Sequence, residues 1–128
     1  MTASKADQDA GRTTGGPHYS PFVMAGGFIF VSGQLPLLPG RDTALASAPF
    51  AAQVEQALHN LETVLADAGA GLAQVVKTTV YLSDIDDWGE VDAIYARFFG
   101  TNRPARSVVP TGPLHFGFRI EIEAIAVA

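Results

Sequence analysis

The first candidate for chemistry is an arginine in an otherwise apolar segment, Arg106 of "ARSVV" at 105–109. A guanidinium is permanently charged and strongly hydrated, so a strand that carries one inward must supply an anionic partner. That partner could be water, a carboxylate of the same chain such as Glu121 or Glu123, or the carboxylate of a ligand bound in bidentate geometry. The residues alone leave these alternatives open.

The last strand of the sequence carries the second candidate, a pair of glutamates. Alternation along "FRIEIEAIAV" predicts an apolar face with Phe118, Ile120, Ile122 and Ala124, and a polar face with Arg119, Glu121 and Glu123. In one interpretation this polar face is solvated and Arg119 neutralises both glutamates. In the other, one glutamate points into a cleft as a general base, because a neighbouring carboxylate raises its pKa towards the useful range.

Smaller polar groups lie in the N-terminal part of the chain. "VSGQ" at 31–34 ends a buried strand with the hydroxyl of Ser32 and the bare backbone of Gly33. These two residues either mark the exit of a strand into a loop or face a small ligand. Tyr19 fits a packed ring with a satisfied hydroxyl as well as it fits a binding site.

Two helices and five strands are predicted to position these groups. The Gly26-Gly27 pair inside 19–36 predicts a β-hairpin, and apolar residues at helical spacing predict a helix over 49–68. A strand over 75–84, a helix over 87–100 with Asp87 as its N-cap, and strands over 105–109 and 118–128 complete the chain. The order ββαβαββ indicates an α+β fold with a single mixed sheet and two helices packed on one of its faces.

Composition restricts the class of protein. The chain has 128 residues, of which 48% are hydrophobic and 16% charged, and its net charge is −5. An acidic chain without a basic stripe is not expected to bind nucleic acid. Cysteine is absent and the three histidines lack the mutual spacing of metal ligands, so no metal site is expected.

The domain organisation follows from the same pattern. Residues 1–16 are small and polar and are interpreted as a flexible N-terminal tail, and residues 17–128 as one domain. The sequence has neither an 18-residue apolar run nor the apolar region of a signal peptide, so we expect a cytoplasmic protein without a membrane partner.

Several strands are apolar on both faces, notably "FIFVSG" at 28–33 and "AIAVA" at 124–128. A strand of this kind must be covered on both sides. Two helices cover only one face of the sheet, and a second copy of the chain is the simplest cover for the other. The sequence therefore predicts an obligate homo-oligomer.

Taken together and in order, these segments resemble the Rid family, the reactive intermediate/imine deaminases that are also called YjgF-type proteins. The resemblance covers residues 17–127 and is carried by "PHYSP", "FIFVSGQLP", "VVKTTVYLSDIDDW", "VDAIYARFFG", "RPARSVV" and "IEIEAIAV". The combination of "PARS" with a following "EIEAIAV" is the most specific of these features.

The resemblance implies a chorismate-mutase-like trimer in which three sheets form a central barrel with the helices outside. It also implies ligand clefts between subunits. In the active branch of the family, the residue matching Arg106 binds a substrate carboxylate and the residue matching Glu121 orients or activates water. The other matching positions are Tyr19, Ser32 and Gly33, so the implied partner of Arg106 is mainly a ligand.

Two positions depart from the family pattern. Val108 stands where many members have cysteine, and imine hydrolysis needs no thiol. Asp92 stands where many have asparagine, and its negative charge near an anion site would weaken carboxylate binding unless it is protonated or turned away. The segment "TGPLHFGF" at 111–118 is also unusual and is a candidate for shaping a pocket around a larger or aromatic imine.

The activity implied by the resemblance is the hydrolysis of 2-aminoacrylate, as its tautomer 2-iminopropanoate, to a 2-keto acid and ammonia. No cofactor is implied, because the imine is already electrophilic. The implied partners are a small-molecule imine or keto acid and further copies of the chain. The alternatives are a pathway-specific deaminase for another enamine, such as 2-aminomuconate, and a non-enzymatic regulator that binds a keto acid.

Overall fold

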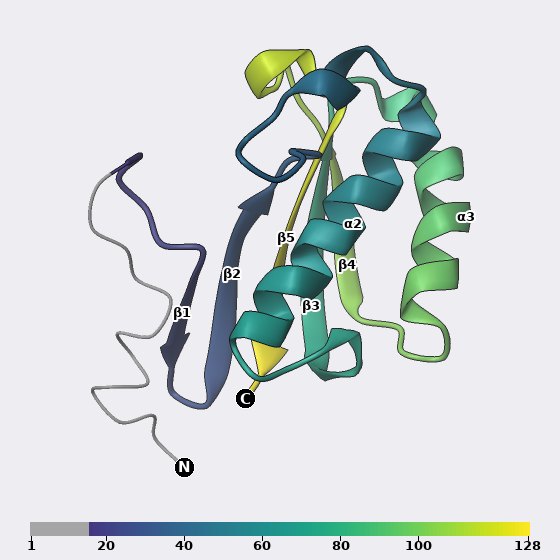
Figure 1. Cartoon of the computed structure of the whole chain (residues 1–128). Coiled ribbons are helices and arrows are strands. Elements are labelled where there is room, and N and C mark those ends of the chain that lie inside the picture. The colour runs from purple at the N-terminus through teal and green to yellow at the C-terminus, as the bar shows by residue number, and fades with distance from the viewer. Residues whose placement is uncertain (1–15) are drawn as a thin grey trace.

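The computed structural model describes residues 16–128, so the tail predicted over 1–16 falls outside this part except for Gly16. The elements along the chain are β1 Phe22–Ala25, β2 Phe28–Gln34, α2 Phe50–Asp67, β3 Val75–Leu82, α3 Trp88–Phe99, β4 Ala105–Pro110 and β5 Ile120–Val127 (Figure 1). The predicted order ββαβαββ is confirmed. No helix in 16–128 is long and apolar enough to cross a membrane.

The strands form one mixed sheet in the order β1-β2-β5-β3-β4. β1 and β2 form the predicted hairpin, in which Gly26 and Gly27 have φ values of 60° and 82° that suit glycine in a tight turn. β3 and β4 are parallel, because α3 carries the chain back to the start of the sheet between them, and the other neighbouring pairs are antiparallel.

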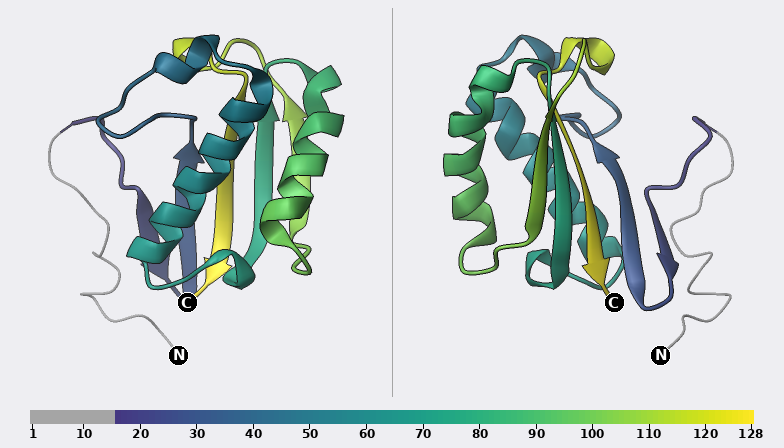
Figure 2. Two further views of the ribbon diagram at one scale, coloured as in Figure 1. Left: turned by 45° about the vertical axis from the view of Figure 1, so that its right-hand side comes forward. Right: turned by 180° about the vertical axis from the view of Figure 1, so that it is seen from behind.

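Both α2 and α3 pack against the same face of the sheet (Figure 2). Their buried apolar residues meet the predicted inward face of β5, where Ile120, Ile122, Ala124 and Ala126 are all buried. From α2 the core receives Val54, Ala57, Leu58, Leu61 and Leu65, and from α3 it receives Val91, Ile94, Tyr95 and Phe99. The α+β architecture with two helices on one face is therefore confirmed.

The opposite face of the sheet is not covered by any element of residues 16–128 (Figure 2, right). Phe28 and Phe30 of β2 are 42% and 44% exposed, and their ring centroids lie 6.3 Å apart. Val127 at the end of β5 is also exposed. The prediction that these strands are apolar on both faces is thus confirmed, and the uncovered face is the one predicted to meet other copies of the chain.

Of two predicted roles near α3, one is confirmed in part and the other is wrong. Asp87 is the N-cap residue of α3 as predicted, but its side chain makes no capping hydrogen bond, because the 3-10 turn Ile85–Asp87 already leads the chain into α3 in a helical conformation. The carboxylate instead accepts hydrogen bonds from Nη2 of Arg119, at 2.7 Å to each oxygen. Arg119 also lies 4.5 Å from the centroid of the Phe50 ring, so it does not neutralise the glutamates of β5.

Candidate active site

The sheet separates the two principal candidates, Arg106 and Glu121. Arg106 on β4 is in register with Thr78 of β3, whose side chain is fully buried beneath the helices. Glu121 on β5 is in register with Tyr81 of β3, which points to the uncovered face because side chains alternate along a strand. Within one chain, the guanidinium and the carboxylate therefore lie on opposite faces.

Arg106, Asp92 and Tyr95 form what we call the arginine group. Nη1 of Arg106 donates a hydrogen bond to Oδ1 of Asp92 at 2.9 Å, and its guanidinium carbon lies 4.9 Å from the centroid of the Tyr95 ring. The Tyr95 hydroxyl is fixed in turn by Thr78 Oγ1 at 2.8 Å. The hypothesis that Arg106 pairs with Glu121 or Glu123 is wrong, because both glutamates project from the other face.

A cavity of about 470 Å³ lies between α3 and β4 beside this group. Its lining consists of Asp92, Tyr95, Ala96, Phe99, Gly100, Asn102, Arg103, Pro104 and Arg106. Val108 follows on the same face of β4, where it is half-buried against the core and is not part of the lining. Sequence reasoning missed Tyr95 and Arg103, although the three-residue spacing between Asp92 and Tyr95 places both on one side of a helix.

Ser32, Gly33 and Glu121 form a second group, the glutamate group. Between Val31, paired with Ala124, and Gln34, paired with Ile122, the register shifts by one residue. This β-bulge sets Ser32 and Gly33 against a single residue of β5. A Cβ atom on Gly33 would lie only 2.9 Å from Cδ of Glu121, so glycine is required for the carboxylate to rest against the backbone there.

Ser32 contributes less to this site than the sequence suggested. Its hydroxyl donates a hydrogen bond of 2.5 Å to the carbonyl of Ser20, and its backbone N–H donates to the carbonyl of Pro21 at 3.0 Å. The hydroxyl proton is therefore committed to the backbone. Ser32 fastens the segment before β1 to the end of β2 and leaves only lone pairs for a ligand.

The two glutamates of β5 differ in their surroundings. Glu123 accepts a hydrogen bond from the hydroxyl of Tyr81, whereas the carboxylate of Glu121 has no hydrogen-bonding partner among residues 16–128. Burial raises the pKa of the Glu121 carboxyl above its ordinary value, His115 opposes this rise, and the charge of Glu123 adds to it. Glu121 is therefore the carboxylate that is available for proton transfer.

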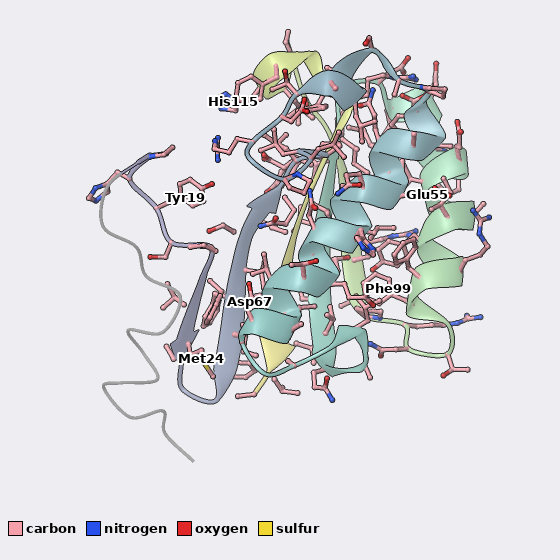
Figure 3. The ribbon with its side chains drawn as sticks, viewed as in Figure 1. Tyr19, Met24, Glu55, Asp67, Phe99 and His115 are labelled. Atoms are coloured by element: carbon pink, nitrogen blue, oxygen red, sulfur yellow. The ribbon has the colours of Figure 1, made fainter. Side chains whose placement is uncertain are left out.

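Tyr19 and the 111–118 segment lie away from the cavity. Figure 3 shows Tyr19 and His115 on the other side of the molecule from Phe99, which lines it. The Tyr19 hydroxyl accepts a hydrogen bond from Nη1 of Arg41 at 3.3 Å. Beside His115, Phe116 is 53% exposed and has a left-handed backbone with a φ of 62°, which is unusual for an aromatic residue.

The raised pKa of Glu121 predicts a pH-dependent effect of Glu121→Gln on stability. A carboxyl whose pKa is higher in the folded than in the unfolded chain contributes stability below the unfolded value, near 4.5, and loses it as the pH rises through the folded value. The amide of the variant does not ionise, so the variant does not lose stability as the pH rises. Its free energy of unfolding should therefore exceed that of the wild type at pH 8 and approach it at pH 4. Urea denaturation at both pH values measures the difference, with Glu90→Gln on the exposed surface of α3 as the control. An advantage that grew towards low pH would contradict the assignment.

Within residues 16–128, no group of three or more histidine, aspartate or glutamate side chains is arranged to hold a metal ion. The arginine and glutamate groups therefore offer a guanidinium, which can pair with an anion, on one face of the sheet and a carboxylate, which can accept a proton, on the other.

Comparison with known proteins places this arrangement in a family. Residues 13–128 match the family model described as Endoribonuclease L-PSP. The chain is 45% identical over 109 residues to the 2-iminobutanoate/2-iminopropanoate deaminase of Rattus norvegicus, covering 85% of this chain and 79% of that one. It is 40% identical over 108 residues to a RutC family protein of Pyrococcus horikoshii, covering 84% and 85%.

Among solved structures, a protein of the conserved Rid family from Yersinia pestis superposes with a TM-score of 0.82 at 35% identity. The match covers 94% of each chain. The resemblance read from "PARS" and "EIEAIAV" is thus confirmed over nearly the whole described structure. The chain belongs to the Rid family of YjgF-type proteins, which the Endoribonuclease L-PSP model represents.

Proposed function

We propose that this protein is an enamine/imine deaminase that hydrolyses 2-iminopropanoate and similar 2-imino acids to 2-keto acids and ammonia. The observation that carries the proposal is Glu121, a half-buried carboxylate with a raised pKa and no hydrogen-bonding partner among the described residues. Arg106 supplies the anion-binding group that a 2-imino acid requires. The name of the 45% identical rat protein, 2-iminobutanoate/2-iminopropanoate deaminase, supports the same chemistry.

The active unit in this proposal is a homotrimer with clefts between chains. A small imino acid cannot contact Arg106 and Glu121 of one chain together, because the sheet lies between them. A cleft between copies would combine the arginine group of one chain with the glutamate group of another. The exposed Phe28 and Phe30 give the uncovered face an apolar surface suited to such an interface.

In the proposed reaction, Arg106 binds the carboxylate of the imino acid and fixes its position. Glu121 takes a proton from water while the water oxygen attacks the imine carbon, and the C=N double bond becomes a C–N single bond. Glu121 passes this proton to the nitrogen, which gives the carbinolamine. Glu121 then takes the proton of the carbinolamine hydroxyl as the carbonyl forms and delivers it to the nitrogen as the C–N bond breaks, so that ammonia leaves and Glu121 is ionised again. The Gly33 backbone lies against Glu121 and would orient the imine end.

We do not propose ribonuclease activity for this chain, although the description of the family model contains the word endoribonuclease. The chain has thirteen acidic and eight basic residues, giving a net charge of −5, which opposes binding to a phosphate backbone.

The direct test is ammonia release from 2-iminopropanoate that is generated in the assay by eliminating water from serine. We expect the protein to accelerate ammonia release over the uncatalysed hydrolysis. A panel of larger imines in the same assay distinguishes a general deaminase from one dedicated to a single pathway. A tight keto-acid complex without any acceleration would contradict the proposal and indicate a binding protein instead.

The assembly is open to a separate measurement. We expect light scattering to give three times the mass of one chain, and the trimer to persist on dilution. An obligate interface of this kind typically buries more than about 2,000 Å², which is too much apolar area to expose reversibly. A stable monomer would contradict the proposed cleft.

Gly33→Ala is expected to lower turnover by up to about a hundredfold, because a displacement of roughly 1 Å in a catalytic group has costs of this order. The new Cβ would lie 2.9 Å from Cδ of Glu121 and force that side chain aside. Only side-chain atoms must move, so the melting temperature should change little. Gly89→Ala on α3 is the control, since a Cβ there meets nothing within 4 Å. Unchanged turnover in Gly33→Ala would show that the carboxylate position is not critical.

A further inference from the structure

Asp92, the acidic residue of the arginine group, already pairs with one nitrogen of the guanidinium that the proposed substrate needs. Asp92 accepts a hydrogen bond from Nη1 of Arg106 at 2.9 Å, and no other nitrogen of that guanidinium has a hydrogen-bonding partner among residues 16–128. The side chain of Arg106 is only 24% exposed, whereas that of Asp92 is 51% exposed. Of the two, Asp92 is the better hydrated and the more easily displaced.

This ion pair affects any ligand that offers a carboxylate. The ligand must either share the guanidinium with Asp92 or displace it, and in both cases two negative charges come close together. An imino acid with an apolar side chain gains nothing that offsets this repulsion. A ligand with a hydrogen-bond donor on its side chain can give Asp92 a new partner a short distance from the bound carboxylate.

The cavity has room for such a side chain. Ala96, Gly100 and Pro104 add little side-chain bulk to its lining, and Tyr95 is held by its bond to Thr78. Asp92 belongs to α3, and a displaced carboxylate therefore stays at the cavity. We infer that Asp92 is a specificity-determining residue, which selects 2-imino acids with a donor such as hydroxyl on the side chain over those with an apolar side chain. This inference rests on the proposed function, in which Arg106 binds the substrate carboxylate.

The test uses two stable keto acids that differ in one group. In 2-oxobutanoate the side chain ends in a methyl group, and in 3-hydroxy-2-oxopropanoate a hydroxyl replaces that methyl. Calorimetric titration of the wild type should show the hydroxyl compound binding at least about tenfold more tightly, which is the lower end of the range for one hydrogen bond to a charged acceptor. In Asp92→Ala the ratio should fall below about twofold, because the repulsion and the acceptor are both removed.

Two further variants distinguish charge from hydrogen bonding. Asp92→Asn keeps an acceptor but loses the charge, so 2-oxobutanoate should bind more tightly while part of the hydroxyl preference remains. Glu90→Ala removes the same charge from an exposed position of α3 and should keep the wild-type ratio. Alanine favours helix, so neither alanine variant should disturb α3.

The inference is overturned if the wild type does not prefer the hydroxyl compound, if Asp92→Ala keeps the wild-type ratio, or if neither keto acid binds. Ammonia release, measured separately, reports on the proposed function. Deamination with an unchanged ratio would leave that function intact and refute only the role of Asp92. If the affinity ratio depends on Asp92 but no deamination occurs, the role of Asp92 stands and the proposed function is refuted.

Discussion

Arg106→Ala is expected to lower kcat/KM for imine hydrolysis by about a hundredfold or more and to leave the assembly intact. A charge-assisted anchor for a carboxylate accounts for about 3 kcal/mol of transition-state binding, which corresponds to a loss of this size. The fold should tolerate the change, because the ion pair with Asp92 is half-exposed and pairs of that kind contribute about 1 kcal/mol or less. Steady-state kinetics and light scattering on the same preparation measure both quantities.

Two variants sharpen this prediction. Arg106→Lys should also lose most activity, since a point charge cannot reproduce the planar fork of a guanidinium. Arg103→Ala removes a cation from the same cavity without breaking the pair with Asp92, and should have a much smaller effect. Full activity in the lysine variant would refute the bidentate anchor. Dissociation or unfolding of Arg106→Ala would assign the side chain a structural role.

Glu121→Gln is expected to lower kcat by about a hundredfold or more and to change keto-acid affinity little, because an amide keeps the shape of the carboxylate but accepts no proton. Since the ionised form is the base, activity should fall as the pH drops through the pKa of Glu121, which burial raises above 4.5. The pH dependence of kcat/KM and calorimetric titration with 2-oxobutanoate measure these effects.

The matched control for this variant is Glu123→Gln on the same strand. The carboxylate of Glu123 is engaged by the Tyr81 hydroxyl and lies two residues, or about 7 Å, further along β5. We expect it to retain most of the activity. Equal losses from the two substitutions would show that the proton-transfer role is wrongly assigned to Glu121 alone.

A mixture of the Arg106→Ala and Glu121→Gln chains tests whether the Arg106 and Glu121 of one cleft come from different copies of the chain. If one chain supplies Arg106 and another supplies Glu121, co-refolding Arg106→Ala with Glu121→Gln in equal amounts should restore about a quarter of the wild-type activity. Each variant refolded alone should stay inactive. No recovery in mixed trimers, verified by differently tagged chains, would place both residues of a cleft in the same chain.

Much of the fold could be predicted because its signals are local. Alternation in "IEIEAIAV" identified the buried face of β5, and the spacing of Val54, Leu58 and Leu61 identified the inner face of α2. The prediction failed at Arg119, which lies just before the first residue of β5. Its side chain pairs with Asp87, which is 32 residues away in the sequence, and alternation contains no information on such a pair.

The candidate site could be predicted only in part for a similar reason. The sequence identified Arg106 and Glu121 as charged residues on two strands, but it could not show that they project from opposite faces. That relation depends on β3 lying between β4 and β5 and on the register of each pair, which tertiary packing sets. The contact of Gly33 with Glu121 was hidden as well, because it follows from a bulge that shifts the register by one residue.

The position of the sheet between Arg106 and Glu121 also bears on how activity should scale with the amount of protein. If no chain holds a complete site by itself, the rate must depend on protein concentration more steeply than linearly wherever trimers and free chains coexist. A partly folded or newly made chain would then be catalytically silent until it meets its partners. Because we expect the trimer to persist on dilution, specific activity should stay constant along a dilution series, and a fall in specific activity would mark dissociation into inactive free chains.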